Sequence, residues 1–225
     1  MSVVNDASCS SGDEILVANR SGLRRIDRSR LLKRVFDLFL GSLILILLIP
    51  LMVAIAIAIK LDSRGPVFYR QFRHGRDGRA FLMTKFRTMF ADRCDESDAS
   101  IIQARPDDTR VTRIGGLLRR RNLDELPQIF DVLKGTMSLV GPRPHPVCFL
   151  EQYSTEISDY RSRLSVKPGI TGWAQVHGLR GETRSIEAMR RRVDYDLHYV
   201  DNRGLGFDLK ILWLTFATFD SPHAY

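Results

Sequence analysis

The sequence has 225 residues, of which 44% are hydrophobic and 27% charged, so it can bury a core and is neither wholly disordered nor fibrous. Lys and Arg outnumber Asp and Glu by 34 to 26, a net charge of +8, which favours nucleic acid, acidic lipid or phosphorylated small molecules as partners. Cys9, Cys94 and Cys148 lie far apart without a CxxC pair. We therefore expect a reducing, cytosolic setting, with neither a disulfide framework nor structural zinc.

The N-terminal region is polar and then basic. Residues 1–19 are small and polar, and we expect a disordered tail. Residues 20–34 carry many arginines and predict either a helix that continues into the next segment or simple attraction to acidic lipid. Lys33 and Asp37 stand four residues apart, so they are predicted to pair on one helix face near the membrane interface.

One long apolar segment dominates the hydropathy pattern. Residues 38–59 contain no charge and, as a helix, would extend about 33 Å, enough to cross a hydrocarbon core. Basic residues flank both ends, although they normally mark only the cytoplasmic side. Pro50 removes a backbone hydrogen bond near the middle and predicts a kink. Two topologies remain open: a single-pass anchor with a tolerated proline, and a helix that enters, bends and leaves by the same face.

The remaining chain predicts a mixture of short elements. Residues 66–90 alternate around a GRDG turn and predict a β-hairpin, and residues 91–112 predict a loop. The proline-rich segment 140–146 predicts a fixed turn, and 167–178 predicts loop with a short strand.

Three helices are expected in the C-terminal two thirds of the chain. The first begins near Asp124 and ends at Gly135, because the spacing of its apolar residues is helical and Pro127 is tolerated only in a first turn. The second covers 185–199. The third covers 208–219, which is too short to span a membrane and would suit the membrane surface. The stripe of the first helix consists of Leu126, Ile129, Phe130 and Leu133.

Two adjacent carboxylates, Asp124 and Glu125, are the strongest candidate for chemistry. At a helix N-terminus the backbone N–H groups stabilise both a carboxylate and a bound phosphate. Three arginines (119–121) precede the pair, and Arg143 follows in the proline-fixed turn. A carboxylate beside phosphate-binding cations can attack phosphorus, and a divalent cation would reduce the repulsion between the two anions. The alternative is that both acids only stabilise a first helical turn.

Other candidates are weaker. Lys85 and Arg87 either bind phosphate or cover a solvated strand face. Walker-type and dinucleotide-binding glycine loops are absent from the sequence. A different class of function, a non-catalytic membrane-anchored basic module that binds nucleic acid or acidic lipid, also explains the charge and the apolar segment. The histidines show no metal-ligand spacing; they are His74, His145, His177, His198 and His223.

Together these segments resemble the monotopic bacterial polyprenyl-phosphate phosphoglycosyltransferases, also called bacterial sugar transferases. The matching segments stand in the family's order and cover about residues 33–212. They are KRVFDLFLGSLILILLIP (33–50), GPVFYRQFRHGRDGRAFLMTKFRTM (65–89), RRRNLDELPQIFDVLKGTMSLVGPRP (119–144), KPGITGWAQVHG (167–178), and YDLHYVDN with DLKIL near the end.

The resemblance implies an α+β, mainly helical fold. A re-entrant membrane helix broken at Pro50 precedes a small cytosolic catalytic domain with interfacial helices and a short β-hairpin. The implied location is the cytoplasmic face of the bacterial inner membrane. The expected units are a tail (1–19), a basic stretch with the membrane helix (20–60), the catalytic domain (61–219) and a C-terminal tail (220–225).

The family's activity is the transfer of a sugar 1-phosphate from a nucleoside diphosphate sugar, by family habit a UDP-hexose, to undecaprenyl phosphate. The reaction uses Mg²⁺, passes through a covalent aspartyl-phosphosugar, and initiates surface polysaccharide synthesis. The implied partners are these two substrates, inner-membrane lipid and downstream glycosyltransferases, without nucleic acid.

The resemblance also implies residue roles. Asp124 corresponds to the nucleophile, and Glu125 to its partner, which takes a proton from the lipid phosphate or helps Asp124 to hold Mg²⁺. Arg143 corresponds to a phosphate-binding arginine. Arg119, Lys85 and Arg87 match basic positions near the site.

The sequence departs from the family pattern at a few positions. Ile49 stands where Ser is common before the helix-breaking proline, which removes a side chain able to satisfy a freed backbone group. Asn122 replaces a common Ser and preserves a polar cap. The chain also matches a minimal catalytic form, without the additional N-terminal membrane helices and soluble domain of larger relatives.

Overall fold

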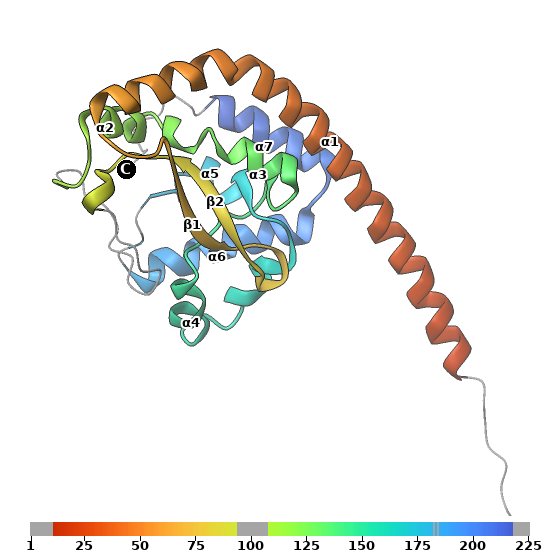
Figure 1. The fold of residues 1–225 in the computed structure, drawn as a ribbon. Helices are drawn as coiled ribbons and strands as arrows, with labels where there is room; N and C mark the ends of the chain where they lie inside the picture. Colours follow the sequence, from red (N-terminus) through yellow and green to blue (C-terminus); the bar gives the residue numbers. More distant parts are fainter. Residues whose placement is uncertain (1–10, 94–107, 182, 184, 218–225) are drawn as a thin grey trace, which may run out of the picture.

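The structure is a computed structural model that describes residues 11–93, 108–181, 183 and 185–217, with side chains from residue 28 onward. It is mainly helical with two small two-stranded sheets. One long apolar helix, α1 (Ser11–Asp62), crosses the top of a body built from the other elements (Figure 1). The fold confirms the expected mainly helical α+β class.

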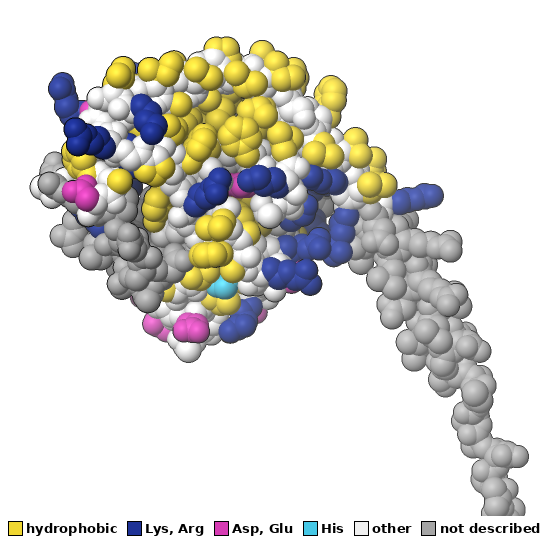
Figure 2. Space-filling model, in the orientation of Figure 1, with side chains coloured by type: hydrophobic (Ala, Val, Ile, Leu, Met, Phe, Trp, Pro, Cys, Tyr) yellow, Lys and Arg dark blue, Asp and Glu magenta, His cyan; other side chains and the backbone are white. Residues whose placement is uncertain are grey.

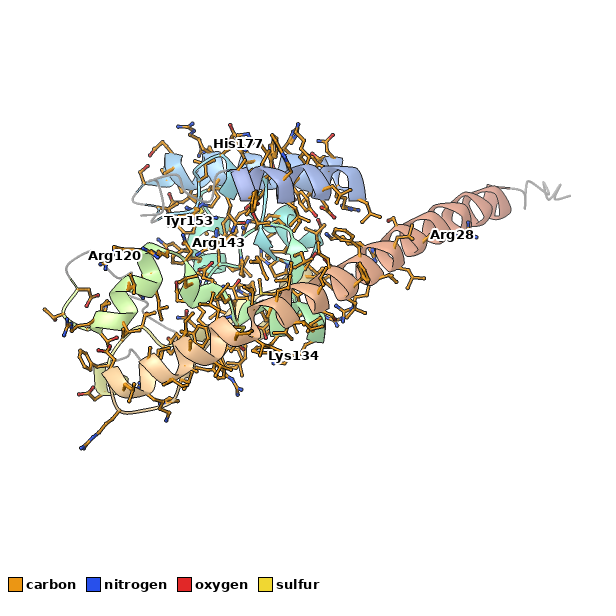
Figure 3. The ribbon with its side chains drawn as sticks, turned by 90° about the horizontal axis from the view of Figure 1, so that it is seen from above. Arg28, Arg120, Lys134, Arg143, Tyr153 and His177 are labelled. Atoms are coloured by element: carbon orange, nitrogen blue, oxygen red, sulfur yellow. The ribbon has the colours of Figure 1, made fainter. Side chains whose placement is uncertain are left out.

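Helix α1 continues through Pro50 without interruption. It curves where it passes over the body in Figure 1 and runs nearly straight when seen from above in Figure 3. A bend of this kind is the expected response to a proline, which lacks the N–H of one helical hydrogen bond. The expected break of the helix at Pro50 is therefore not confirmed, because α1 is curved but continuous.

The helix also starts earlier than the sequence suggested. It begins at Ser11, inside the range expected to be a disordered tail, and residues 1–10 lie outside the described part. Residues 13–18 read DEILVA, without proline and with several good helix formers, so local propensity favours the observed extension.

The expected ion pair between Lys33 and Asp37 is replaced by long-range contacts. Lys33 Nζ lies 2.7 Å from Asp208 Oδ2, and Asp37, which is only 2% exposed, accepts hydrogen bonds from Ser138 Oγ at 3.0 Å and Leu139 N at 3.1 Å. The predicted pair was wrong for an energetic reason. Leaving these buried donors and the buried Asp208 without partners would cost more free energy than a surface i,i+4 ion pair contributes.

The hairpin is confirmed. Strands β1 (Phe68–His74) and β2 (Ala80–Phe86) pair antiparallel, with Phe68 opposite Phe86. A 3-10 turn, Arg76–Gly78, joins them, and Asp77 has a φ of 59°. A second short 3-10 turn, Ala91–Arg93, starts the expected loop, of which residues 94–107 lie outside the described part.

The region around the paired carboxylates differs from the expectation of one helix. Helix α2 (Arg113–Arg120) is followed by a 3-10 turn, Leu123–Glu125, and only then by α3 (Gln128–Lys134). Pro127 directly precedes α3 because it has no N–H to donate to the 3-10 turn before it. The predicted end is confirmed, with Gly135 at a φ of 91°.

The second sheet is parallel and holds the proline-rich segment. Strands β3 (Ser138–Val140) and β4 (Gly169–Thr171) pair side by side, which confirms the short strand expected in 167–178. A Cβ on Gly169 would lie 2.1 Å from Gly141 N, so only glycine allows this approach. The connection between the strands contains α4 (Cys148–Ser154) and the 3-10 helix Tyr160–Ser165, which the sequence did not predict.

Three helices follow β4. They are α5 (Trp173–Val176), α6 (Ile186–Asn202) and α7 (Leu205–Ala217). The last two confirm the helices expected from 185 and 208, although α7 starts three residues earlier. The main core lies between α1, α3, β3, α6 and α7; its buried members are Met83, Ile129, Val132, Met137, Leu139, Val140, Tyr199 and Ile211.

Much of α1 faces outward. Residues 28–62 are long and apolar enough to cross a membrane, and only 17% of the most apolar stretch is buried against the rest of the chain. Figure 2 shows hydrophobic side chains gathered along the top of the molecule, over α1. In α7, Trp213 is 69% and Phe216 87% exposed. An apolar surface of this extent fits contact with lipid rather than water.

Asp37→Ala is expected to lower the free energy of unfolding by about 1–3 kcal/mol, because the buried Ser138 hydroxyl and Leu139 N–H lose their acceptor. Chemical or thermal unfolding in detergent measures the change. Asp194→Ala, on the exposed face of α6, is the control and should stay within about 0.5 kcal/mol of wild type. Equal stability of the two variants would contradict the assigned role of Asp37.

Candidate active site

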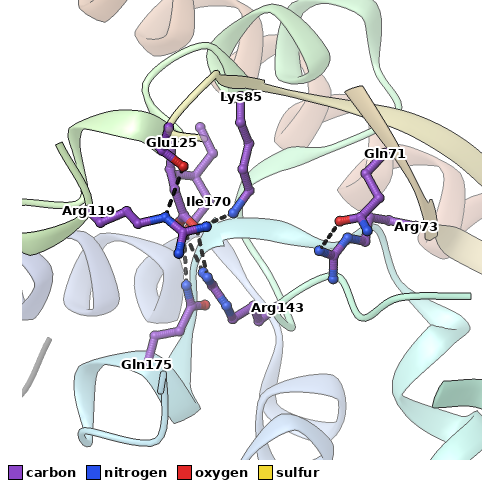
Figure 4. Close-up of polar contacts among 9 residues, drawn as sticks. Gln71, Arg73, Lys85, Arg119, Glu125, Arg143, Ile170 and Gln175 are labelled. Atoms are coloured by element: carbon purple, nitrogen blue, oxygen red, sulfur yellow. Dashed lines mark hydrogen bonds and ion pairs between the residues drawn. The ribbon is translucent and has the colours of Figure 1, made fainter. Parts of the chain in front are cut away.

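The Glu125 carboxylate lies between two cations from distant parts of the chain (Figure 4). Lys85 Nζ, from β2, lies 2.7 Å from Oε1. Arg143, from the loop after β3, donates through Nη2 to Oε1 at 2.7 Å and through Nη1 to Oε2 at 3.0 Å. The two-pronged contact is a strong, charge-assisted pairing that also fixes the guanidinium plane.

These cations decide the ionisation of Glu125. Burial raises the pKa of Glu125, but the charges and hydrogen bonds of Arg143 and Lys85 outweigh it and hold the pKa well below its ordinary value of 4.5. Glu125 in turn raises the pKa of Arg143. Glu125 is therefore ionised at neutral pH. Both of its carboxylate oxygens accept hydrogen bonds from cations.

Asp124 is placed differently. Asp124 is 9% exposed. Within the described part of the chain, its carboxylate makes no hydrogen bond or ion pair. Burial raises its pKa above 3.8, as does the neighbouring Glu125, against the opposing charges of Lys85, Arg119 and Arg143. Asp124 is thus a poorly solvated carboxylate whose oxygens remain available to another molecule.

Arg119 completes one side of the cluster. Its Nε donates to Thr88 Oγ1 at 2.9 Å, and its charge reaches Asp124. Its neighbours Arg120 and Arg121 are exposed, and Figure 3 shows Arg120 at one end of α2. Only the first of the three consecutive arginines therefore takes part in the cluster.

Arg87 lies outside the cluster, and its expected role in phosphate binding stays a prediction. It is 3% exposed and donates through Nη2 to Ser63 O at 2.8 Å and through Nη1 to Arg64 O. These are carbonyls just beyond the C-terminus of α1, which lack helical partners. Arg87 therefore holds the end of α1, because it follows β2 rather than continuing the strand face that carries Lys85.

Two arginines near the site were not singled out by the sequence. Arg73, on β1, has its pKa lowered to about 10 by burial and by repulsion from Arg143. Burial and the Arg143 charge also lower the pKa of Arg180. Lys85 is opposite Tyr69 in the hairpin, so strand alternation places Arg73 on the same face as Lys85 and could have identified it. Arg180 follows a loop and gives no such signal.

The histidines of the described residues belong to no candidate metal site. In the described ranges no three His, Cys, Asp or Glu residues group together in a way that could hold a metal ion, and His223 lies outside them. His145 is buried beside several arginines, and its pKa lies well below 6.5 because of burial first and their charges second. Its Nδ1 shares a hydrogen bond of 2.6 Å with the Tyr160 hydroxyl, which indicates a structural role.

Glu125→Gln is expected to destabilise the fold by about 1–3 kcal/mol at pH 7, because two partly buried cations lose their counter-charge. The folded-state pKa of Glu125 is depressed, so its contribution is present above the unfolded value of about 4.5 and is lost as pH falls through the lower folded value. The difference between variant and wild type in denaturant unfolding should thus shrink below pH 4.5. Glu151→Gln, at an exposed carboxylate, is the control; a Glu125→Gln effect equal to it would contradict the pairing.

Comparison with known proteins identifies related sequences. A family model described as bacterial sugar transferase matches residues 28–220. The UDP-glucose:undecaprenyl-phosphate glucose-1-phosphate transferase of Escherichia coli (strain K12) is 50% identical over 198 residues, which are 88% of this chain and 42% of that protein. The Caulobacter vibrioides protein of the same name is 46% identical over 81% of this chain and 67% of its own length.

A shorter relative is matched over most of its length. The exopolysaccharide production protein PSS of Rhizobium leguminosarum bv. phaseoli is 43% identical over 82% of this chain and 92% of its own. By contrast, the chain spans only about two fifths of the Escherichia coli, Klebsiella pneumoniae and Xanthomonas campestris relatives. The family model covers most of the chain, including the Asp124–Glu125 turn, both sheets and the part of α1 from residue 28 onward. The chain belongs to the bacterial sugar transferase family.

Proposed function

We propose that this protein transfers a sugar 1-phosphate from a UDP-sugar to undecaprenyl phosphate and so initiates a surface polysaccharide. The observation that carries the proposal is Asp124, a buried carboxylate without a partner among the described residues. It stands beside a carboxylate that holds Lys85 and Arg143. The relatives' names support the substrate class: glucose 1-phosphate for the Escherichia coli protein and N-acetylgalactosamine phosphate for an Aeromonas hydrophila protein 42% identical over 83% of this chain.

In the first step an Asp124 oxygen attacks the sugar-bearing phosphorus of the donor. A bond forms between that oxygen and phosphorus, the diphosphate P–O bond breaks, and UMP leaves with the bridging oxygen. Burial leaves Asp124 poorly solvated, so once ionised it is a stronger nucleophile than a carboxylate in water. Lys85, Arg143 and Arg119 stabilise the charge that develops on the phosphoryl oxygens.

In the second step an oxygen of the lipid phosphate attacks the same phosphorus. The bond to Asp124 breaks, which regenerates the carboxylate and leaves the sugar on a lipid diphosphate. Glu125 is the partner residue in this scheme. Because two cations hold its pKa low, Glu125 is a weak base, and we assign it the orientation of Arg143 and Lys85 rather than proton removal.

The residues present fit a magnesium ion that is shared with substrate. Mg²⁺ commonly binds through one or two carboxylates together with substrate phosphates. Glu125 has both oxygens committed to cations, so Asp124 is the carboxylate free to be its protein ligand. A bound ion would supply charge neutralisation between Asp124 and the diphosphate.

The protein is proposed to sit on the cytoplasmic face of the bacterial inner membrane, with α1 re-entrant. Two cations just before the apolar segment connect α1 to the domain. Lys33 pairs with Asp208 of α7. The Arg34 guanidinium donates to the Val132 and Leu133 carbonyls of α3, each at 2.6 Å. At the end of α1, Asp62 accepts from Ile114 N at 3.1 Å. Both ends thus contact one polar domain, which favours one side of the membrane for both.

Asp124→Asn is expected to abolish the covalent intermediate and lower UMP release by about a thousandfold or more. The reason is that a neutral amide cannot attack the phosphorus and displace UMP. Mass spectrometry of detergent-solubilised protein incubated with UDP-sugars and Mg²⁺ should show a sugar-phosphate adduct on wild type only. Asp194→Asn, at an exposed position of α6, is the matched control and should form the adduct. Wild-type chain that forms no adduct and releases no UMP with any donor, or turnover that survives in Asp124→Asn, would overturn the proposal.

The topology is tested by cysteine labelling. Single cysteines at Arg30 and Arg70, both exposed and on opposite sides of the apolar segment, are placed in a chain whose three native cysteines are replaced by serine. In inverted inner-membrane vesicles, a membrane-impermeant thiol reagent should label both positions. Labelling of only one of them, with the other reached after detergent is added, would instead indicate a spanning helix.

A further inference from the structure

The loop that carries Arg143 is fixed by backbone contacts on nearly every residue. Gly141 N donates to Thr171 O at 2.9 Å, and Pro142 O accepts from Gly169 N at 3.0 Å, both across the second sheet. His145 O accepts from His74 N of the hairpin at 3.2 Å. Prolines at 142 and 144 restrict the backbone on both sides of Arg143. The carbonyl of Arg143 itself therefore also needs a partner.

That partner is a side chain with no assigned role. Arg163 Nη2 donates to Arg143 O at 2.7 Å. The same guanidinium donates to Asp196 Oδ2 through Nε at 2.9 Å and Nη2 at 2.6 Å, and its side chain and that of Asp196 are 1% and 2% exposed. The Tyr160 ring lies 5.6 Å from the Arg163 guanidinium carbon. Arg163 is thus locked between α6 and the Arg143 loop.

A buried ion pair is a poor source of stability, because desolvation offsets most of its attraction and an apolar pair of similar size is often as stable. Here the pair does something that an apolar pair could not do: it leaves a guanidinium donor aimed at one main-chain carbonyl. The side chain of that same residue, Arg143, makes the two-pronged contact with Glu125. A small displacement of this backbone would move the guanidinium out of line with both Glu125 and a bound phosphate.

We propose that Arg163, held by Asp196 of α6, is a positioning residue that fixes the Arg143 main chain so that its guanidinium meets Glu125 and the transferred phosphate. The inference rests on the proposed function for its chemical readout. The proposal links α6 to the site through a chain of contacts. Asp196 of α6 binds Arg163, and Arg163 binds the Arg143 carbonyl. The Arg143 side chain in turn binds Glu125.

The test uses the double variant Arg163→Met/Asp196→Leu, which removes both charges of the pair together, so that neither is left buried without the other. In the full-length protein, adduct formation from UDP-sugar is expected to slow by about 10–100-fold, because misplacing a charged group near the reacting phosphorus by about 1 Å has effects of this size. Arg163→Lys, which keeps a cation beside Asp196, should recover part of the rate. Wild-type rates in the double variant would overturn the proposal.

A double-mutant cycle separates positioning from general support of the fold. If Arg163 acts through Arg143, the double variant should change the rate by less than about twofold in an Arg143→Lys background. Full additivity in that background would mean a merely structural role and would overturn the inference.

A variant elsewhere in the fold controls for general destabilisation. Lys33→Met breaks the ion pair to the fully buried Asp208 and removes no contact of Arg163 or Arg143. This control should leave adduct formation close to the wild-type rate, and equal slowing in the control and in the double variant would overturn the inference.

Adduct formation by wild type and its loss in Asp124→Asn report on the proposed function alone. If these succeed while the Arg163 variants behave like the Lys33 control, only the positioning role is lost.

Discussion

The contact on which the site depends is the pairing of Glu125 with Lys85 and Arg143. Each partner comes from a different element: a 3-10 turn, the second strand of the hairpin, and a loop between two strands of another sheet. Burying these charges is favourable only if each finds its counterpart in good geometry. The hairpin, α3 and the small parallel sheet must therefore be assembled before the cations can lie together, which makes the site a consequence of the whole fold.

The pKa values of the two neighbouring carboxylates shift in opposite directions. Cations hold the pKa of Glu125 down, whereas burial raises that of Asp124. Adjacent groups with opposite shifts are a common sign of divided labour in catalysis. The Glu125 carboxylate binds two cations. The Asp124 oxygens have no partner among the described residues, as the proposed attack on phosphorus requires. Neither role would follow from the sequence order alone, since both residues belong to the same short turn.

The sequence predicted those features that arise from local pattern. Alternation around a GRDG turn predicted the hairpin, and the uncharged run from 38 to 59 predicted the long helix. It failed where a side chain has a choice of partners. Lys33 and Asp37 are correctly spaced to pair with each other. Instead, each binds a residue more than 100 positions away in the sequence. Arg87 likewise has a distant partner, because it donates to a carbonyl at the end of α1, and its expected role in phosphate binding stays a prediction. Strand alternation could have identified Arg73, but only the pairing with β2 shows which residues share its face.

The apolar helix α1 and the site form one packing unit. Gly41 of α1 is buried against α3; a Cβ there would lie 3.4 Å from Leu133 Cδ2 and 3.6 Å from Ile129 Cδ1, so the helices approach closely without a side chain between them. Helix α3 begins directly after the turn that carries Asp124 and Glu125, and its last carbonyls are held by Arg34 of α1. The apolar helix thus braces the element next to the carboxylates. In the proposed function, placing α1 at the lipid surface consequently also sets where the carboxylates face, so that a soluble donor and a lipid phosphate would reach the same Asp124.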